Sequence, residues 1–283
     1  MTEERLTEMP VRGEQAADWA MEIDGLSVAP HGREILRVDR LRVPAGQTLV
    51  VIGPNGAGKS TLLNACLGFV RPAAGSVAVL GRKITRLAGA ALCRLRRRIG
   101  YVPQRLAHGG VMPLTVREVV AIGRTGLRGL LRPLRPEDWA AVDEWIERLG
   151  LAGLARRSYA DLSGGEQRKC LIAKAMVKRP DLLMLDEPTA NLDLYWRERI
   201  VEVMNELAGR ARLTVVLVSH EPQVLPAAAE RLLLLEAGRV AADGPPRAVL
   251  TPERVGELYG PGLAVEPRGG RLAVVPAADV RAG

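Results

Sequence analysis

The sequence predicts an α/β fold with a parallel sheet and a helical insertion. Short apolar runs that are typical of strands recur along the chain and alternate with amphipathic stretches that are typical of helices. Two apolar runs, around Val50 and Leu183, are almost continuous, as expected for strands buried on both faces of a parallel sheet. The predicted strands are residues 21–28, 47–53, 76–81, 182–186, 213–219 and 231–238, and the predicted helices are residues 136–150, 166–178 and 194–209.

The order of these elements predicts one main domain with short extensions. Residues 1–19 lack apolar periodicity and are expected to form a flexible tail. The main domain spans residues 20–260, starts with a β-rich segment and contains a largely helical region at about 87–178. Residues 261–283 form a short extension, in which the weakly alternating GGRLAVVPA predicts a small terminal strand.

The composition is that of a globular protein, with 47% hydrophobic and 25% charged residues in a chain of 283. Its 40 basic residues against 32 acidic ones give a formal net charge of +8, which favours anionic partners. Aromatic residues make up only 3%, and Phe69 is the single phenylalanine. Base-stacking surfaces therefore have little to be built from, and we expect no nucleic-acid partner.

The cysteines and the N-terminal residues predict a protein of a reducing compartment that does not cross a membrane by itself. Cys66, Cys93 and Cys170 are odd in number and far apart, which excludes a disulfide framework and a zinc-knuckle spacing. Residues 1–15 are acidic and polar, unlike a signal peptide, and no uncharged apolar run approaches the roughly 20 residues of a membrane span.

A glycine-rich segment follows the predicted strand at 47–53 and precedes a helix-like run. It consists of Gly53, Pro54, Asn55, Gly56, Ala57, Gly58, Lys59, Ser60 and Thr61. Such a loop turns its backbone N–H groups and a helix N-terminus toward phosphates, with Lys59 on the β- and γ-phosphates and the Ser60 hydroxyl on Mg²⁺. A glycine-rich turn that binds nothing is the alternative, but the full pattern in this context predicts a nucleotide-phosphate site.

Two carboxylates, Asp186 and Glu187, end the predicted buried strand at 182–186. An unpaired charge there would be costly, so these residues need a partner or a function. Asp186 is suited to hold Mg²⁺ and Glu187 to act as a general base on the attacking water. Taken alone, the pair could equally cap a strand end, but together with the phosphate loop it predicts a hydrolytic site.

The segment LSGGEQRK at 162–169 places Ser163, Gly164 and Gly165 at the start of a predicted helix. A hydroxyl, bare backbone amides and a helix N-terminus could bind a second anion. Taken alone, however, Ser163 and Glu166 have the spacing of an ordinary capping box, and one nucleotide does not need two phosphate cradles.

The complete set of motifs resembles the nucleotide-binding subunits of ATP-binding-cassette (ABC) transporters. GPNGAGKST resembles the Walker A motif, YVPQ the Q-loop with Gln104, LSGGEQ the signature, LLMLDEP the Walker B motif, NLD the D-loop with Asp193, and VSHE the switch histidine His220. The six motifs occur in the family's order over roughly residues 20–260. The resemblance implies a RecA-like P-loop NTPase core, an N-terminal antiparallel β subdomain and a helical signature subdomain.

The resemblance also implies an ATPase that uses ATP and Mg²⁺ and works as a head-to-tail dimer with a second copy or a paralogous ATPase. In such a dimer Ser163 and Gly165 face the γ-phosphate that the partner's loop holds, which accounts for two anion sites. The resemblance gives Gln104 a role in sensing that phosphate and contacting Mg²⁺, and His220 a role in holding it and orienting water for Glu187.

His31 departs from the family pattern. Many family members stack adenine on an aromatic residue at this position, and here VAPHGRE places a histidine there. Because imidazole offers less stacking area than a tyrosine, we expect weak discrimination between bases and comparable hydrolysis of ATP and GTP.

Transport is the predicted role, since the chain resembles importer subunits that lack a fused membrane domain. Residues 115–138 resemble the corresponding stretch in ATPases for uptake of metal cations or metal chelates. This resemblance implies a separate membrane permease, an extracytoplasmic substrate-binding protein acting indirectly, and a location at the cytoplasmic face of the membrane. A soluble ABC ATPase with a cytosolic partner, for example in iron–sulfur assembly, an exporter, a different cargo and a non-hydrolysing ABC-like regulator are the alternatives.

The positive charge is concentrated in one segment. Residues 82–135 contain 13 basic residues and one acid, Glu118, so the rest of the chain, with 27 basic and 31 acidic residues, is mildly acidic. Our hypothesis is that this segment, with Arg124, Arg128 and Arg132, forms a surface that docks on the permease or on anionic lipid. A solvated arginine-rich face without a partner is the alternative.

Overall fold

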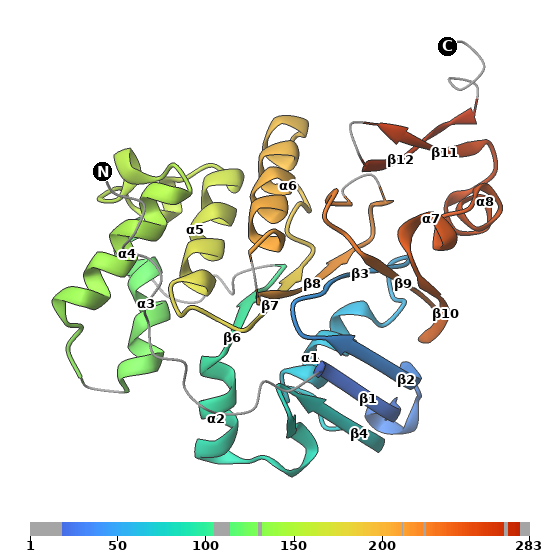
Figure 1. The fold of residues 1–283 in the computed structure, drawn as a ribbon, viewed down its shortest axis with the longest axis horizontal. Helices are drawn as coiled ribbons and strands as arrows, with labels where there is room; N and C mark the ends of the chain where they lie inside the picture. Colours follow the sequence, from blue (N-terminus) through green and yellow to red (C-terminus); the bar gives the residue numbers. More distant parts are fainter. Residues whose placement is uncertain are drawn as a thin grey trace.

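A ten-stranded sheet forms the centre of the computed structural model, which describes residues 19–104, 114–129, 132–210, 212–222, 225–268 and 271–277. The strand order is β5-β4-β1-β2-β10-β9-β3-β8-β7-β6 (Figure 1). The strands are β1 (Trp19–Val28), β2 (Leu36–Pro44), β3 (Thr48–Ile52), β4 (Ala74–Val79), β5 (Arg82–Lys83), β6 (Ile99–Val102), β7 (Leu182–Asp186), β8 (Thr214–Ser219), β9 (Arg231–Glu236) and β10 (Arg239–Gly244).

The sheet has a parallel half and an antiparallel half. Strands β9, β3, β8, β7 and β6 pair in parallel, whereas β1 pairs antiparallel with β2 and β4, and β10 pairs antiparallel with β9. All six predicted strands are present. The sequence analysis missed β2, β5, β6 and β10. In β2 and β10 exposed residues interrupt the apolar ones, β6 has only four residues and β5 only two.

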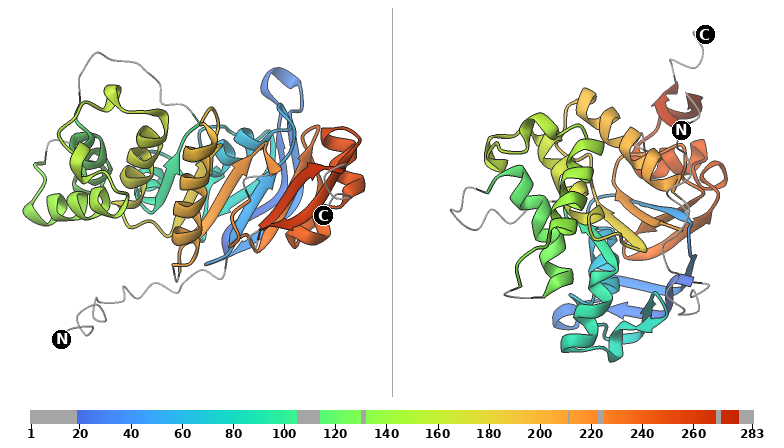
Figure 2. Two further views of the ribbon diagram at one scale, coloured as in Figure 1. Left: turned by 90° about the horizontal axis from the view of Figure 1, so that it is seen from above. Right: turned by 60° about the vertical axis from the view of Figure 1, so that its left-hand side comes forward.

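Helices lie on both faces of this sheet, and some of them form a group of their own at one side. They are α1 (Lys59–Cys66), α2 (Gly89–Arg97), α3 (Val116–Arg128), α4 (Pro136–Arg148), α5 (Gly164–Met176), α6 (Leu194–Ala208), α7 (Pro246–Val249) and α8 (Pro252–Tyr259). Helices α3, α4 and the start of α5 make the group at the left of Figure 1, which also lies at the left in the left-hand view of Figure 2. The three predicted helices correspond to α4, α5 and α6. The region predicted to be largely helical, at about 87–178, also contains the strand β6. The boundaries given for this subdomain stay a prediction.

The core has two parts, one on each face of the parallel strands. Val50 and Ile52 pack into one cluster with α3, α4 and α5, while Leu49 and Val51 pack into the other with α1. All five residues of β3 are buried, and the same is true of β7. Burial on both faces is the reason that these strands lack hydrophobic alternation, as predicted.

A buried ion cluster joins α3 to α4. Asp138, with no exposed surface, accepts hydrogen bonds from Nε of Arg124 at 2.8 Å, from Arg128 and from the backbone N of Arg135 at 3.0 Å. Burial by itself would raise the pKa of Asp138, but these hydrogen bonds outweigh it and lower the pKa to about 2. Arg124 and Arg128 are therefore ion-paired within the fold, with 17% and 25% of their side chains exposed, and the hypothesis that they dock a partner stays a prediction. Arg132 is exposed.

The C-terminal extension folds as a hairpin. Strands β11 (Leu263–Arg268) and β12 (Arg271–Pro276) pair antiparallel, and Val274 and Val275 are buried. The sequence analysis predicted one strand here and missed β11. The predicted N-terminal tail lies outside the described residues except for Trp19, which begins β1. Every helix in the described part of the chain is too short or too polar to cross a membrane.

Candidate functional site

The phosphate loop connects the buried strand β3 to α1. Gly53 adopts a φ of 154°, and a Cβ added there would lie 2.0 Å from the carbonyl oxygen of Leu235, so only glycine fits. Gly58 precedes α1 in the left-handed conformation (φ 94°) and has no side chain to cap the helix. The first turn of α1 is thus left with bare amides, as a phosphate site requires.

Lys59 projects back into this loop. Its Nζ donates hydrogen bonds to the carbonyl oxygens of Gly53 at 2.8 Å and Pro54 at 3.0 Å and lies 4.0 Å from Oε1 of Glu187. Only 5% of the residue is exposed, and burial lowers the pKa of Lys59, while the nearby Glu187 and Asp186 carboxylates act in the opposite direction. The ammonium group is held in place by weak neutral acceptors that a phosphate could replace.

Ser60 and Asp186 meet although 126 residues separate them in the sequence. The Ser60 hydroxyl donates to Oδ1 of Asp186 at 3.1 Å. Asp186 ends β7 and is 5% exposed, and burial raises its pKa, with the Ser60 hydrogen bond opposing this shift and the Glu187 charge adding to it. The carboxylate is therefore kept in an environment that disfavours its charge.

Glu187 lies at the centre of the site and is 7% exposed. Its backbone has a left-handed φ of 46°, which is uncommon for a residue with a side chain, and its N–H donates to the carbonyl of Val218 on the neighbouring strand at 2.9 Å. One carboxylate oxygen accepts a hydrogen bond from Nε2 of Gln104. The other lies 3.2 Å from Nδ1 of His220.

That ring nitrogen of His220 is buried and makes no well-aligned hydrogen bond within the described part of the chain. The parallel strands explain this gathering, because β6, β7 and β8 all end at the same edge of the sheet and deliver Gln104, Glu187 and His220 respectively. The structure thus brings together the phosphate loop and all the candidate catalytic side chains.

The signature segment at 162–169 is separate from the cluster around Glu187 and more exposed to solvent. Ser163 caps α5 and forms the full capping box with Glu166 that its spacing predicts. A Cβ added to Gly165 would lie 2.0 Å from the indole ring of Trp196 on α6, and one added to Gly164 would lie 3.2 Å from Leu192. These two glycines therefore allow α5 to pack against the segment that contains Asp193, which caps α6 by accepting from the N–H of Trp196 at 2.9 Å.

Arg168 is a residue of the site that the sequence analysis missed. It extends from α5, is 7% exposed, and donates to the carbonyl oxygens of Pro103 at 2.8 Å and Gln104 at 3.0 Å. Burial lowers its pKa. The signature helix is in this way joined to the backbone of the residue that contacts Glu187. A basic residue after the signature could have drawn attention to it, but its partners are more than 60 residues away in the sequence.

His31 is not joined to this cluster. His31 is exposed in a short turn, Pro30–Gly32, and has a left-handed φ of 53°. The structure describes no side chain stacked on it. His108, expected to be solvent-exposed, lies outside the described residues.

Comparison with known proteins agrees with this geometry. The family model described as ABC transporter matches residues 36–190, which is more than half of the chain. The chain belongs to the ABC transporter family. Its ABC ATPase fold and its ATP-binding and ATPase character, predicted from the six motifs, are thereby confirmed.

Several relatives of this ABC protein are similar over most of their length. The hemin import ATP-binding protein HmuV of Streptomyces coelicolor is 41% identical over 254 residues, covering 89% of this chain and 88% of the relative. The zinc transport system ATP-binding protein TroB of Treponema pallidum is 37% identical over 246 residues, covering 87% and 88%. Among solved structures, an inward-facing metal-chelate type ABC transporter matches with a TM-score of 0.76 and 27% identity, over 91% of this chain and 97% of the other.

Proposed function

We propose that this protein is the ATP-hydrolysing subunit of an importer that takes up a metal cation or a metal chelate through a separate permease. The observation that carries the ATP-hydrolysing part of the proposal is the arrangement of buried Lys59, Glu187 and the polar groups Gln104 and His220 at one sheet edge. The hemin and zinc relatives support the cargo class, since one name describes hemin import and the other zinc transport.

Mg²⁺ fits the oxygen groups that the site offers. The Ser60 hydroxyl and the Asp186 carboxylate lie 3.1 Å apart, the Gln104 amide is at the same edge, and a divalent cation would relieve the cost of keeping Asp186 charged in a buried position. Bound Mg²⁺ would neutralise charge on the β- and γ-phosphates during phosphoryl transfer.

The protein's own groups supply positioning and proton transfer. The loop amides and Lys59 bind the phosphates, and Glu187 accepts a proton from the attacking water. The buried, unsatisfied Nδ1 of His220 is available to donate to a terminal phosphate oxygen or to orient that water. The Gln104 amide holds the Glu187 carboxylate in place until the nucleotide arrives.

A second copy, or a paralogous ATPase, would complete the site. Ser163, Gly164 and Gly165 present a helix N-terminus without a cation of their own, which suits an anion that another subunit already holds. Asp193 would lie at the same contact, because it caps the helix against which Gly165 packs. Closure of two such surfaces on ATP, and reopening after hydrolysis, would drive the permease.

This function places the protein at the cytoplasmic face of the membrane, bound to the permease and connected through it to an extracytoplasmic substrate-binding protein. The test is affinity purification of the full chain from detergent-solubilised membranes of its own cells, followed by uptake of ⁶⁵Zn²⁺ or hemin into vesicles that contain the purified complex. A stoichiometric polytopic membrane partner and ATP-dependent uptake are expected, and the Glu187→Gln chain should assemble equally but not drive uptake. A stoichiometric cytosolic partner instead would refute the transport role.

A further inference from the structure

His220 is flanked by two carboxylates, one at each of its ring nitrogens. Its Nδ1 lies 3.2 Å from Oε1 of Glu187, and its Nε2 lies 3.7 Å from Oε1 of Glu221. Glu221 follows His220 directly in the chain, and its N–H donates to the hydroxyl of Ser219, the last residue of β8, at 3.0 Å. The imidazole is therefore placed between the carboxylate of the general base and a second carboxylate that belongs to the same turn.

Arg197 on α6 supplies the counter-charge for this second carboxylate. Its Nη1 lies 3.3 Å from Oε2 of Glu221, and the two side chains are 28% and 21% exposed. Nε of Arg197 and Oε2 of Glu221 are buried atoms that make no well-aligned hydrogen bond within the described residues. Removing two charges from water costs about as much as their attraction returns, so stability alone is a poor explanation for this pair.

The helix that carries Arg197 is a rigid support. One turn further along α6, Ile200 and Val201 are buried in the core. A second ion pair of the same helix, between Arg199 and Glu202 at 2.6 Å, is exposed and local. The pair of Arg197, by contrast, joins α6 to the turn after β8, so it fixes two separate elements relative to each other.

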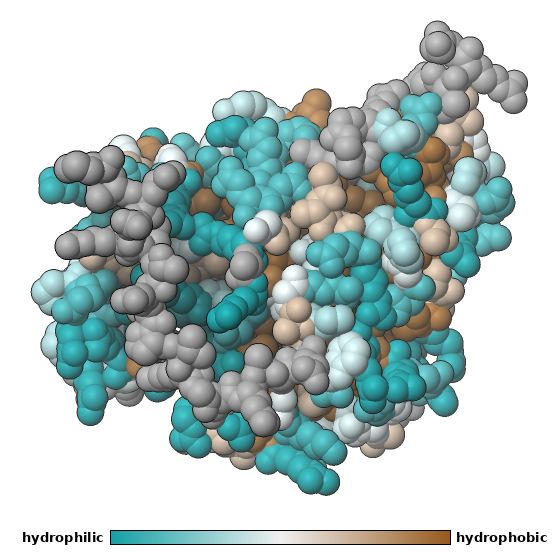
Figure 3. Space-filling model, in the orientation of Figure 1, coloured by the Kyte–Doolittle hydropathy of each residue, from teal (hydrophilic) through white to brown (hydrophobic). Residues whose placement is uncertain are grey.

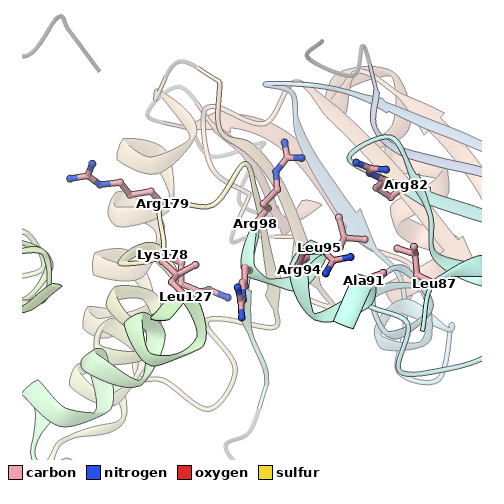
Figure 4. A pocket seen from close by; sticks show the side chains of 10 residues that line it. Arg82, Leu87, Ala91, Arg94, Leu95, Arg98, Leu127, Lys178 and Arg179 are labelled. Carbon is pink, nitrogen blue, oxygen red and sulfur yellow. The ribbon is translucent and has the colours of Figure 1, made fainter. Parts of the chain in front are cut away.

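A second group of cations lies too far from this turn to take part in it. Arg98 and Lys178 belong to the lining of a basic cavity of about 680 Å³ between α2 and the ends of α3 and α5 (Figure 4). Arg98 directly precedes β6, whereas Glu221 comes shortly after the end of β8, and the strands from β6 to β8 are parallel. The two places are at opposite ends of the sheet, and the counter-charge of Glu221 comes from Arg197.

We propose that Arg197 and Glu221 are positioning residues for His220, an inference that rests on the proposed roles of His220 and Glu187 in hydrolysis. Arg197 holds the Glu221 carboxylate, and that carboxylate faces Nε2 of the ring, which keeps Nδ1 turned toward Glu187. Without this support the ring is free to rotate about its side-chain bonds, and the productive geometry is sampled less often. Both residues act through His220.

The first measurement is the spectrum of the ring nitrogens in the full-length, nucleotide-free chain labelled with ¹⁵N-histidine. The chain has three histidines, so comparison with His220→Ala assigns the signals of His220. Glu221→Gln and Arg197→Met should each move these signals, because they report which ring nitrogen carries a hydrogen and what it faces. The matched controls Glu202→Gln and Arg199→Met, in the exposed pair of the same helix, should leave them unchanged.

The second measurement is steady-state ATP hydrolysis on the same preparations. Arg197→Met and Glu221→Gln should each lower kcat by roughly three- to tenfold and change KM by less than about twofold, since the phosphate loop is untouched. The double variant should be no slower than the slower single variant, because both changes break one connection. Arg197→Lys keeps the charge and should restore part of the loss.

A merely structural pair would give a different set of results. It would lower the unfolding temperature of Arg197→Met while the His220 signals and the kcat of the folded protein stay as in the wild type. The inference is overturned by that outcome, by controls that lower kcat equally, or by effects that multiply in the double variant. Wild-type turnover in Glu187→Gln would instead refute the proposed hydrolytic site, and the spectra without nucleotide do not depend on it.

Discussion

Two buried aspartates of this protein have opposite electrostatic environments. Asp138 in the helical group has its pKa lowered to about 2, because two guanidinium groups and a backbone N–H overcome the effect of burial. Asp186 at the sheet edge has its pKa raised, because burial outweighs one hydroxyl hydrogen bond and the positive charge nearby. The charged Asp138 carboxylate therefore stabilises the folded protein, whereas the charged Asp186 carboxylate lowers its stability.

This difference separates structural from functional charge. Asp138 holds α3 against α4 and has no remaining capacity to bind a ligand. Asp186, Glu187 and Lys59 form a cluster in which each charge is only partly compensated, so a nucleotide with its cation can supply what is missing. Figure 3 shows a largely hydrophilic face in which such differences cannot be seen, because both clusters are buried.

The largest expected effect is on ATP turnover, and it comes from a change in the nucleotide site. Glu187→Gln should reduce ATP turnover by roughly 10² to 10⁴-fold, because the amide cannot accept the proton of the attacking water. Nucleotide affinity and thermal stability should change little, since the side-chain shape is kept. The measurements are steady-state phosphate release and nucleotide binding on the same preparation. Turnover within tenfold of the wild type would remove Glu187 from this role.

The largest effect on stability should come from the structural aspartate. Asp138→Asn removes the buried carboxylate that Arg124 and Arg128 share, leaving Arg128 only the exposed Glu137 at 3.7 Å, and should cost about 3 kcal/mol in the free energy of unfolding. Because the folded pKa of Asp138 is below the ordinary value of 3.8, its contribution is complete above about pH 4 and is lost as the pH falls toward 2. Urea unfolding of both chains across this range should give curves that converge at low pH. A constant difference would contradict the assignment.

Asp186→Asn, unlike Asp138→Asn, should not destabilise the nucleotide-free protein. Removing a carboxylate whose charge is disfavoured by burial should leave the free energy of unfolding of the nucleotide-free protein within about 1 kcal/mol of the wild type or above it at neutral pH. ATP hydrolysis should nevertheless be lost. Differential scanning calorimetry at pH 7 gives the comparison with Asp138→Asn directly, and a destabilisation as large as that of Asp138→Asn would show that the two aspartates do not differ as described.

The smallest expected effect concerns the link between α5 and the Q-loop. Arg168→Met removes two hydrogen bonds to the backbone of Pro103 and Gln104 and should lower kcat several-fold with little change in KM, because Gln104 is less well placed against Glu187. Arg168→Lys should restore part of the loss. If KM alone rises, or if Lys restores nothing while the fold is intact, Arg168 does not position Gln104.

Much of the site could be predicted from the sequence. The phosphate loop, Asp186 and Glu187 are local signals, in which residue type, spacing and the end of a strand coincide. Gln104 and His220 were predicted from the resemblance to the ABC family. The capping box at Ser163 and the buried strands β3 and β7 are equally local, since each depends on neighbours within a few residues. Strands β2 and β10 were missed because they are partly exposed, and β5 and β6 because two and four residues carry too little pattern.

The sequence by itself determined the family, the order of the catalytic motifs and the concentration of positive charge. Only the tertiary structure decided which of those charges are free. Arg124 and Arg128 pair with Asp138, whereas Arg94 and Arg97 form no ion pair with the described residues. The physical reason is that the state of a charge depends on burial and on partners brought close by folding, and sequence separation does not reveal which ones will meet.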